Sequence, residues 1–159
     1  MGDRLPDGVI AAIALGSNLG DRQAHLDDAI RRLSESLSSL RASSYIETSP
    51  VDMRPGAPAF LNAAVVGTTR LSAREVLDRL LAIEQDRGRE RPYANAPRTL
   101  DLDLILFGDV ITDEPGLILP HPRFRERRFV LAPLAEIGAT LVDPVTRRSV
   151  AELLAMCRD

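Results

Sequence analysis

Two aspartates separated by one residue stand in the segment Pro97-Arg98-Thr99-Leu100-Asp101-Leu102-Asp103-Leu104-Ile105-Leu106-Phe107. Leucine at alternate positions predicts a β-strand that carries Leu100, Leu102, Leu104 and Leu106 on one face and the aspartates on the other. The two carboxylates then lie about 6–7 Å apart along the strand. Because they repel each other and their oxygens suit Mg²⁺, the pair predicts a metal site, with Arg98 suited to a phosphate. The alternative is an acidic edge strand that faces solvent.

The residue counts exclude several classes of site. One cysteine and two histidines are too few for a Cys/His zinc site, so any metal must be bound by oxygen. All 20 basic residues are arginine, which excludes a P-loop and Schiff-base chemistry. A net charge of −3 argues against a nucleic-acid partner. Arginines nevertheless cluster over 87–98 and 123–128, which favours a small phosphorylated ligand.

Length and composition predict a single domain of ordinary composition. The 159 residues, 45% hydrophobic and 27% charged, suit a single domain over 1–159 with a flexible tail over 1–8. No apolar run approaches the roughly 20 residues of a membrane span, and the first residues do not form a signal peptide. We therefore expect a cytoplasmic protein without membrane contact, and a monomer.

The order of the expected elements predicts the fold. They are a strand over 9–15, a helix capped by Asp21, a strand over 41–48, a strand over 60–69, a helix opened by a Ser72–Glu75 capping box, and the aspartate strand. This β-α-β-β-α-β order predicts a ferredoxin-like α/β (α+β) fold, with a mainly antiparallel sheet and helices on one face. C-terminal additions follow: strand signals near Val110 and Leu117, an apolar segment over 130–137 and a helix capped by Ser149.

Five motifs occur in order along the chain: 14–20 (ALGSNLG), 60–65 (FLNAAV), 88–91 (GRER), 97–103 (PRTLDLD), and 120–123 (PHPR) with Arg127 and Phe129. Together they closely resemble the hydroxymethyl-dihydropterin pyrophosphokinases of folate synthesis. The resemblance spans about residues 9–155 and implies a ferredoxin-like fold. It also implies transfer of the β,γ-diphosphate of ATP to the hydroxymethyl group of 6-hydroxymethyl-7,8-dihydropterin, with release of AMP.

The resemblance implies roles for individual residues. Asp101 and Asp103 would hold two Mg²⁺ ions that bridge the triphosphate of ATP. The residues matched to ATP binding are Glu84, Arg89, Arg91, Arg98, His121 and Arg127, and Arg89 and Arg98 join the aspartates as catalytic residues. The residues matched to the pterin are Phe60 and Phe129, which would stack on its faces, and Thr48 and Asn62, which would hydrogen-bond its edge.

Five of these residues also have an interpretation without a functional role. Glu84 could be a solvated helix residue, and His121 an ordinary loop histidine between two prolines. Phe60 and Phe129 could belong to the core, with Asn62 beside a turn. Outside the matched set, we expect Arg123, Arg125 and Arg128 on a solvated face, His25 on the surface of the first helix, and Cys157 in a packing or surface position.

One segment departs from the family pattern. Ala94-Asn95-Ala96-Pro97-Arg98 stands where the family has a basic residue followed by Trp-Gly-Pro-Arg. The missing tryptophan lies in the family's mobile loop that closes over the substrates, so loop closure and turnover rate are the properties that this departure affects. We expect the loops over 49–59 and 89–97 to be mobile without ligand and to order over ATP and pterin.

Two other functions compete with this interpretation. Gly16-Ser17 together with an Asp-x-Asp pair is typical of nucleotidyltransferases, but there the pair follows within a few tens of residues, and here Asp101 comes 84 residues after Ser17. Such an enzyme would release pyrophosphate rather than AMP. A ferredoxin-like RNA-binding module would need aromatic and basic residues on its central strands, where this chain has two aspartates. An RNA gel shift separates that module from an enzyme.

Overall fold

The central element of the fold is a five-stranded antiparallel sheet. The structure is a computed structural model that describes residues 8–48, 59–88 and 99–158. The strands are β1 (Val9–Ser17), β2 (Ser38–Ala42), β3 (Ile46–Thr48), β4 (Phe60–Thr69) and β5 (Asp101–Phe107). Their order in the sheet is β2-β4-β1-β5, and β3 also pairs with β4. This arrangement confirms the ferredoxin-like fold.

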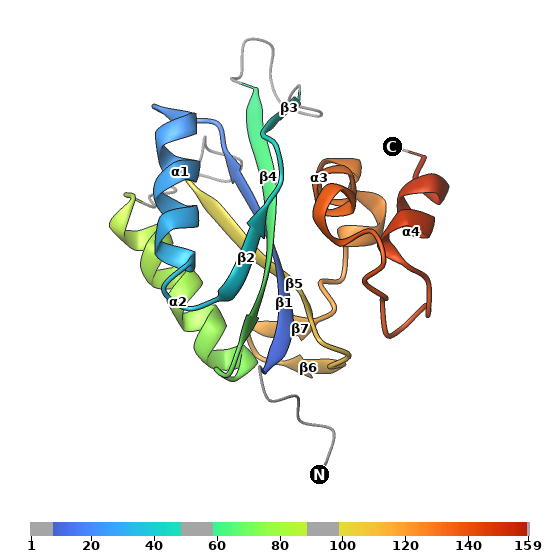
Figure 1. Cartoon of the computed structure of the whole chain (residues 1–159). Helices are drawn as coiled ribbons and strands as arrows, with labels where there is room; N and C mark the ends of the chain where they lie inside the picture. The colour runs from blue at the N-terminus through green and yellow to red at the C-terminus, as the bar shows by residue number, and fades with distance from the viewer. Residues whose placement is uncertain (1–7, 49–58, 89–98, 159) are drawn as a thin grey trace.

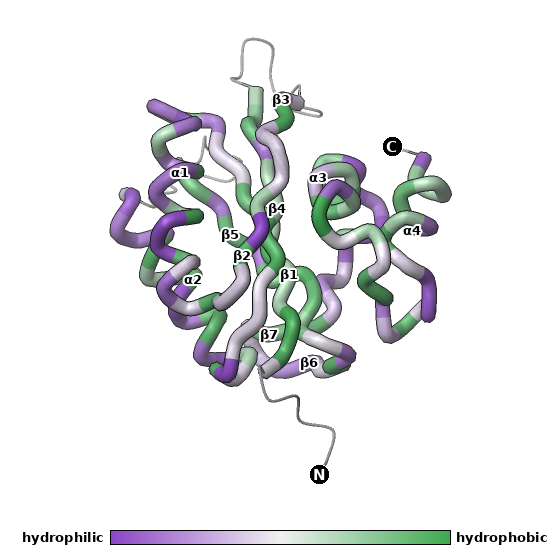
Figure 2. Tube along the Cα trace, in the orientation of Figure 1, coloured by the Kyte–Doolittle hydropathy of each residue, from purple (hydrophilic) through white to green (hydrophobic). Residues whose placement is uncertain are grey.

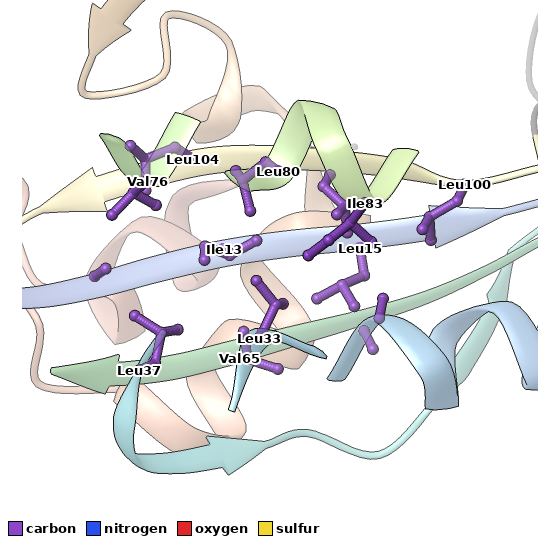
Figure 3. Close-up of a cluster of buried hydrophobic side chains, with 14 of the residues drawn as sticks. Ile13, Leu15, Leu33, Leu37, Val65, Val76, Leu80, Ile83, Leu100 and Leu104 are labelled. Atoms are coloured by element: carbon purple, nitrogen blue, oxygen red, sulfur yellow. The ribbon is translucent and has the colours of Figure 1, made fainter. Parts of the chain in front are cut away.

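Helices cover both faces of the sheet (Figure 1). The two helices of the β-α-β-β-α-β core lie on one face, as expected, and the C-terminal additions supply the helices of the other face. On one face, α1 (Arg22–Leu33) and α2 (Ala73–Asp86) enclose a hydrophobic cluster that includes Ile13, Val65 and Leu80 (Figure 3). The other face packs against α3 (Arg128–Gly138) and α4 (Val150–Met156) through a second cluster. Hydrophobic residues accordingly concentrate along the central strands (Figure 2). The apolar segment over 130–137 lies within α3, and its apolar side chains pack against the second face of the sheet.

The helix starts follow the capping signals in the sequence. The Asp21 carboxylate accepts a hydrogen bond from the Ala24 N–H, so it caps α1 as predicted. Both predicted capping boxes are present, Ser72 with Glu75 at α2 and Ser149 with Glu152 at α4. These ends are set by local hydrogen bonds, which is why the sequence identifies them.

The expected continuous strand over 41–48 is instead two strands. β2 ends at Ala42 and β3 begins at Ile46. Between them, the Ser44 N–H and hydroxyl donate to the two carboxylate oxygens of Glu136 on α3, at 2.9 and 2.7 Å. The strand breaks because its backbone N–H bonds to a side chain from the far layer rather than to a neighbouring strand.

The alternation of β5 also ends earlier than predicted. Ile13 pairs with Leu104 and Ala12 pairs with Leu106, so Ile105 is an extra residue in a β-bulge. Leu100, Leu102 and Leu104 keep the predicted face toward α1 and α2, whereas Leu106 lies in the cluster on the other face. The aspartates precede the bulge and keep their predicted face.

The C-terminal additions begin with a hairpin and a short helical turn. The hairpin is formed by β6 (Thr112–Glu114) and β7 (Leu117–Leu119), and the turn is η1 (Phe124–Glu126). Leu117 therefore begins a strand as expected, whereas Val110 lies before one. Among the described residues, no helix is long and apolar enough to cross a membrane.

Candidate functional site

The strand register brings the candidate residues to one end of the sheet. Gly16, near the end of β1, pairs with Asn62 on β4 and with Asp101 on β5. Directly opposed residues of an antiparallel sheet point to the same face. Two residues further along, the next pair on the same face is Ala14 with Ala64. Both pack into the cluster under α3, which shows that Asn62 and Asp101 lie on that face.

Asp101 and Asp103 form the acidic part of this site. Both are partly buried, and Asp103 pairs with Ala14 on the same face as Asp101. Within the described ranges, no group of three or more histidine, cysteine, aspartate or glutamate residues could hold a metal ion alone. Mg²⁺ typically uses one or two carboxylates and takes its other ligands from substrate phosphates and water. The pair therefore suits an ion that arrives with a phosphorylated ligand.

Glu84 on α2 holds the backbone of the aspartate strand. Its side chain is only 4% exposed, so the solvated alternative is wrong. One carboxylate oxygen accepts the Leu102 N–H at 2.7 Å. Because β5 is an edge strand, this carboxylate satisfies a backbone donor that no strand pairs. It does so at the residue between the two aspartates.

His121, in the connection after β7, lies beside β5 and close to Asp103. Its backbone N–H donates to the Ile105 carbonyl at 3.0 Å, and its ring Nδ1 accepts the Arg123 backbone N–H at 3.1 Å. Burial lowers the pKa of His121, Asp103 opposes that change, and Arg127 and Arg123 add to it. The ring is then neutral at pH 7 and carries its proton on Nε2, available to donate to an anion.

Two arginines around η1 have different contacts: Arg127 lies beside an aromatic ring, and Arg125 pairs with a buried aspartate. The Arg127 guanidinium lies 5.7 Å from the centre of the Phe129 ring, in a cation–π contact beside His121. Arg125, which we expected on a solvated face, instead forms a two-pronged ion pair with the buried Asp143, at 2.5 and 3.0 Å. This pair ties η1 to the segment between α3 and α4.

We expect Asp143→Ala to lower the free energy of unfolding by about 3 kcal/mol at pH 7, because Arg125 would lose its partner. Burial raises the pKa of Asp143, but hydrogen bonds from Arg125, Thr146 and the Val145 N–H outweigh that effect and bring it to about 2. A lowered pKa gives stability above the unfolded value of about 3.9, and that stability disappears as pH falls toward the folded value. Urea unfolding should show the difference between the two proteins shrinking from pH 4 to pH 2. A constant difference would contradict the assignment, and the exposed Asp113→Ala serves as the control.

The polar and aromatic residues at the other edge of the site come from β3 and β4. Asn62 is 4% exposed within β4 rather than beside a turn, and its amide nitrogen donates to the Thr48 hydroxyl at 2.7 Å. Phe60 is partly buried and Phe129 is 39% exposed, and neither joins the two hydrophobic clusters of the described chain. Both rings therefore retain free surface, contrary to the core interpretation.

Gly16 is a site residue to which we assigned no role from the sequence. A Cβ at this position would lie 3.3 Å from the Asn62 amide oxygen and 3.6 Å from a ring carbon of Phe60. The absence of a side chain at Gly16 therefore leaves room above β1 for the side chains of Asn62 and Phe60. The only signal in the sequence was its place in the 14–20 motif.

Several predicted features lie outside the described residues. They are Arg89, Arg91, Arg98, the departure at 94–96, the loop over 89–97 and nearly all of the loop over 49–59. The structure does place the residues that flank these segments, among them Thr48, Gly88 and Thr99. Of the twelve residues matched to the family, the other nine are described: seven lie on strands or helices, and His121 and Arg127 lie in the connections on either side of η1.

Comparison with known families assigns the chain. The family model for 7,8-dihydro-6-hydroxymethylpterin-pyrophosphokinase matches residues 12–139. The chain belongs to this family. A pyrophosphokinase of Bacillus subtilis, named for 2-amino-4-hydroxy-6-hydroxymethyldihydropteridine, is 46% identical over 130 residues, which are 80% of this chain and 77% of the relative. Its namesake from Pseudomonas aeruginosa is 39% identical, with 91% and 90% covered.

Some relatives in the family are much longer. The folic acid synthesis protein fol1 of Pneumocystis carinii is 41% identical over 140 residues, and the match covers 87% of this chain but 19% of that protein. A solved HPPK-DHPS structure in complex with substrates superposes with a TM-score of 0.71 at 13% identity, over 94% of this chain and 43% of the other. At that identity the superposition confirms the fold alone. The chain thus spans less than half the length of each of these two proteins.

Proposed function

We propose that this chain transfers the β,γ-diphosphate of ATP to the hydroxymethyl group of 6-hydroxymethyl-7,8-dihydropterin in folate biosynthesis, with release of AMP. The observation that carries the proposal is the register of Gly16 between Asn62 and Asp101. It puts a carboxylate pair suited to a metal–triphosphate beside an amide suited to a flat heterocycle. Both substrates are thereby held at one end of the sheet, as transfer between them requires.

The phosphate side of the reaction falls to Asp101, Asp103 and the residues around them. We propose that Asp101 and Asp103 are the residues that would hold two Mg²⁺ ions, which when bound would supply positive charge to neutralise the triphosphate. His121 is suited to donate from Nε2 to a phosphate oxygen, and Arg127 to pair with the same group. Arg89, Arg91 and Arg98 complete the proposed ATP site by their match to the family.

The pterin side falls to the residues of β3, β4 and α3. We propose that Phe60 and Phe129 stack on the two faces of the pterin, since both rings retain free surface. Asn62, oriented by its hydrogen bond to Thr48, then reads the donor and acceptor groups of the pterin edge. The chain positions the hydroxymethyl group, whose oxygen forms a new bond to the β-phosphorus. The bond that breaks joins the β-phosphorus to the oxygen that bridges it to the α-phosphorus, and this oxygen leaves on AMP.

The proposal is tested by the products. With ATP, Mg²⁺ and the dihydropterin, the chain should release AMP in equal amount to the diphosphorylated pterin, and no AMP without pterin. Release of pyrophosphate instead would indicate a nucleotidyltransferase. A shift of RNA in a gel with no AMP release would favour the RNA-binding module. Light scattering of the same sample tests the expected monomer.

A further inference from the structure

The last turn of α2 connects the aspartate strand to α1. Glu84 in this turn accepts the Leu102 N–H at 2.7 Å. Gly88, which follows the helix, accepts a hydrogen bond on its carbonyl from the Thr99 hydroxyl at 3.4 Å. Thr99 lies two residues before β5 and Leu102 is the second residue of β5, so the two bonds hold the start of the strand and Asp101 lies between their attachment points.

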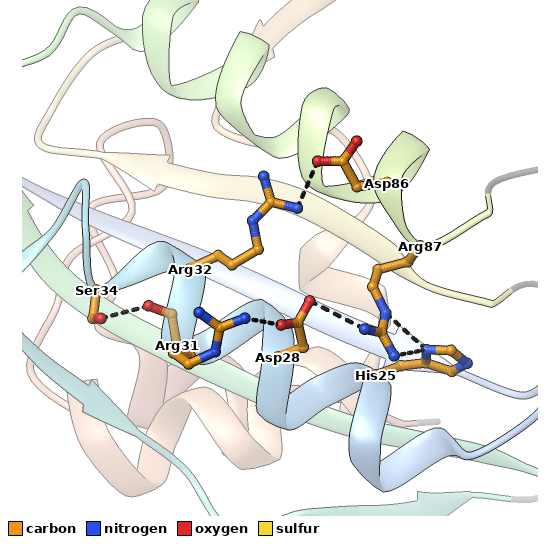
Figure 4. Close-up of polar contacts among 7 residues, drawn as sticks. All are labelled: His25, Asp28, Arg31, Arg32, Ser34, Asp86 and Arg87. Carbon is orange, nitrogen blue, oxygen red and sulfur yellow. Dashed lines mark hydrogen bonds and ion pairs between the residues drawn. The ribbon is translucent and has the colours of Figure 1, made fainter.

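Arg87 attaches this same turn to α1 (Figure 4). It caps the C-terminus of α2, and its guanidinium donates to His25 Nδ1 from Nε at 3.0 Å and from Nη2 at 2.7 Å. Its Nη1 lies 3.3 Å from a carboxylate oxygen of Asp28. The Arg87 and Asp28 side chains are 26% and 17% exposed, so the contacts are partly shielded from water. His25 is also partly buried rather than on the surface as we expected.

His25 is held in turn by the segment that follows β1. A Cβ on Gly20, which has a φ of +74°, would lie 3.1 Å from His25 Nε2, so the turn lies close against the ring. The imidazole therefore stands between the turn after β1 and the guanidinium from α2. The contact between Arg87 and His25 was not evident from the sequence, because these partners are 62 residues apart.

We propose that Arg87 and His25 are positioning residues that fix the metal-binding strand through the last turn of α2. The clasp formed by Arg87, His25 and Asp28 holds that turn to α1, and Glu84 and Gly88 transmit its position to β5. This inference rests on the proposed function, because the position of the aspartates matters for ATP only if they bind its metal.

The clasp requires a neutral His25. Nδ1 accepts N–H groups only while it is unprotonated, and an imidazolium would repel Arg87. Burial lowers the pKa of His25 and Arg87 lowers it further, whereas Asp21 and Asp28 raise it. Within the described parts of the chain, Arg87 from α2 and these two aspartates from α1 and its cap are the charged groups acting on the ring. The lowered pKa keeps the clasp intact at neutral pH, and acidification breaks it.

The central test compares Arg87→Gln with Arg32→Gln. Arg32 also bridges α1 and α2, through an ion pair with Asp86 at 2.8 Å, and its side chain lies away from His25 (Figure 4). We expect Arg87→Gln to raise the KM for magnesium-ATP about fivefold or more. It should also accelerate hydrogen exchange at the Leu102 amide and weaken binding of a non-hydrolysable magnesium-ATP analogue. Pterin affinity should stay within about twofold, and Arg32→Gln should alter none of these.

A second pair of variants addresses the histidine. Glutamine at position 25 offers an amide oxygen to Arg87, whereas leucine offers no acceptor. His25→Gln should therefore preserve the ATP affinity and Leu102 protection that His25→Leu loses. As pH falls from 7.5 to 5.5, the wild-type protein should lose more analogue affinity than His25→Gln does. His121 titrates in both proteins, so the difference between the profiles reports His25.

Several results would overturn the clasp. Equal effects of Arg87→Gln and Arg32→Gln would do so, as would unchanged Leu102 exchange in Arg87→Gln or identical behaviour of the two His25 variants. If Arg87→Gln fails to fold, the His25 pair decides. Amide exchange needs no turnover, so a wild-type protein without AMP release would defeat the proposed function and still leave the clasp to be judged.

Discussion

Alanine in place of Asp101 or Asp103 should reduce turnover about a thousandfold, because a carboxylate-held metal ion contributes several kcal/mol to charge stabilisation in phosphoryl transfer. The fold should persist. Removing one of two like charges on a strand face relieves repulsion, so the free energy of unfolding should stay the same or rise. Steady-state AMP release and urea unfolding measure the two quantities on the same preparations.

The controls for this prediction separate the metal role from general charge. Asp113→Ala removes an exposed aspartate on β6, which follows the end of β5 opposite to Asp101, and should leave turnover unchanged. Raising the Mg²⁺ concentration should restore part of the activity of the single variants, since each retains one carboxylate. A folded Asp101→Ala or Asp103→Ala protein with wild-type turnover would remove the metal assignment.

Asn62→Ala should weaken pterin binding about tenfold or more and leave magnesium-ATP affinity within about twofold. A buried partner lost from a hydrogen bond typically costs about 1–3 kcal/mol, which matches that factor. Asn62 is 4% exposed and its amide is oriented by the Thr48 hydroxyl, so the site is set before the pterin arrives. Calorimetric titrations with pterin and with a non-hydrolysable ATP analogue measure the two affinities separately.

Thr48 provides the matched variant for the second prediction. Thr48→Val keeps the shape of the side chain but removes the hydroxyl that accepts from Asn62, so it should weaken pterin binding in the same direction by a smaller factor. If ATP affinity fell as far as pterin affinity in Asn62→Ala, the residue would serve the whole site rather than the pterin edge. Unchanged pterin affinity would end the assignment.

The sequence by itself determined those features that depend on neighbours along the chain. Side chains of a strand alternate between faces, so the spacing of Asp101 and Asp103 was enough to place them on one face. Helix starts are closed by side chains within three residues, so Ser72 and Ser149 identified α2 and α4. The order of such elements was enough to predict the ferredoxin-like sheet, and the family motifs selected the candidate site residues that the predictions above test.

Only the tertiary structure decided what depends on contacts between distant segments. The break between β2 and β3 follows from Glu136 on α3, and the bulge at Ile105 turns Leu106 away from its predicted face. Arg125 and His25 appeared to be surface residues because their partners, Asp143 and Arg87, come from other elements. Short-range sequence patterns indicate which helix, strand or turn a segment forms and which face a side chain occupies. The hydrogen bonds and ion pairs that join layers depend on which surfaces meet, and that is settled only when the sheet, its register and both helix layers have formed.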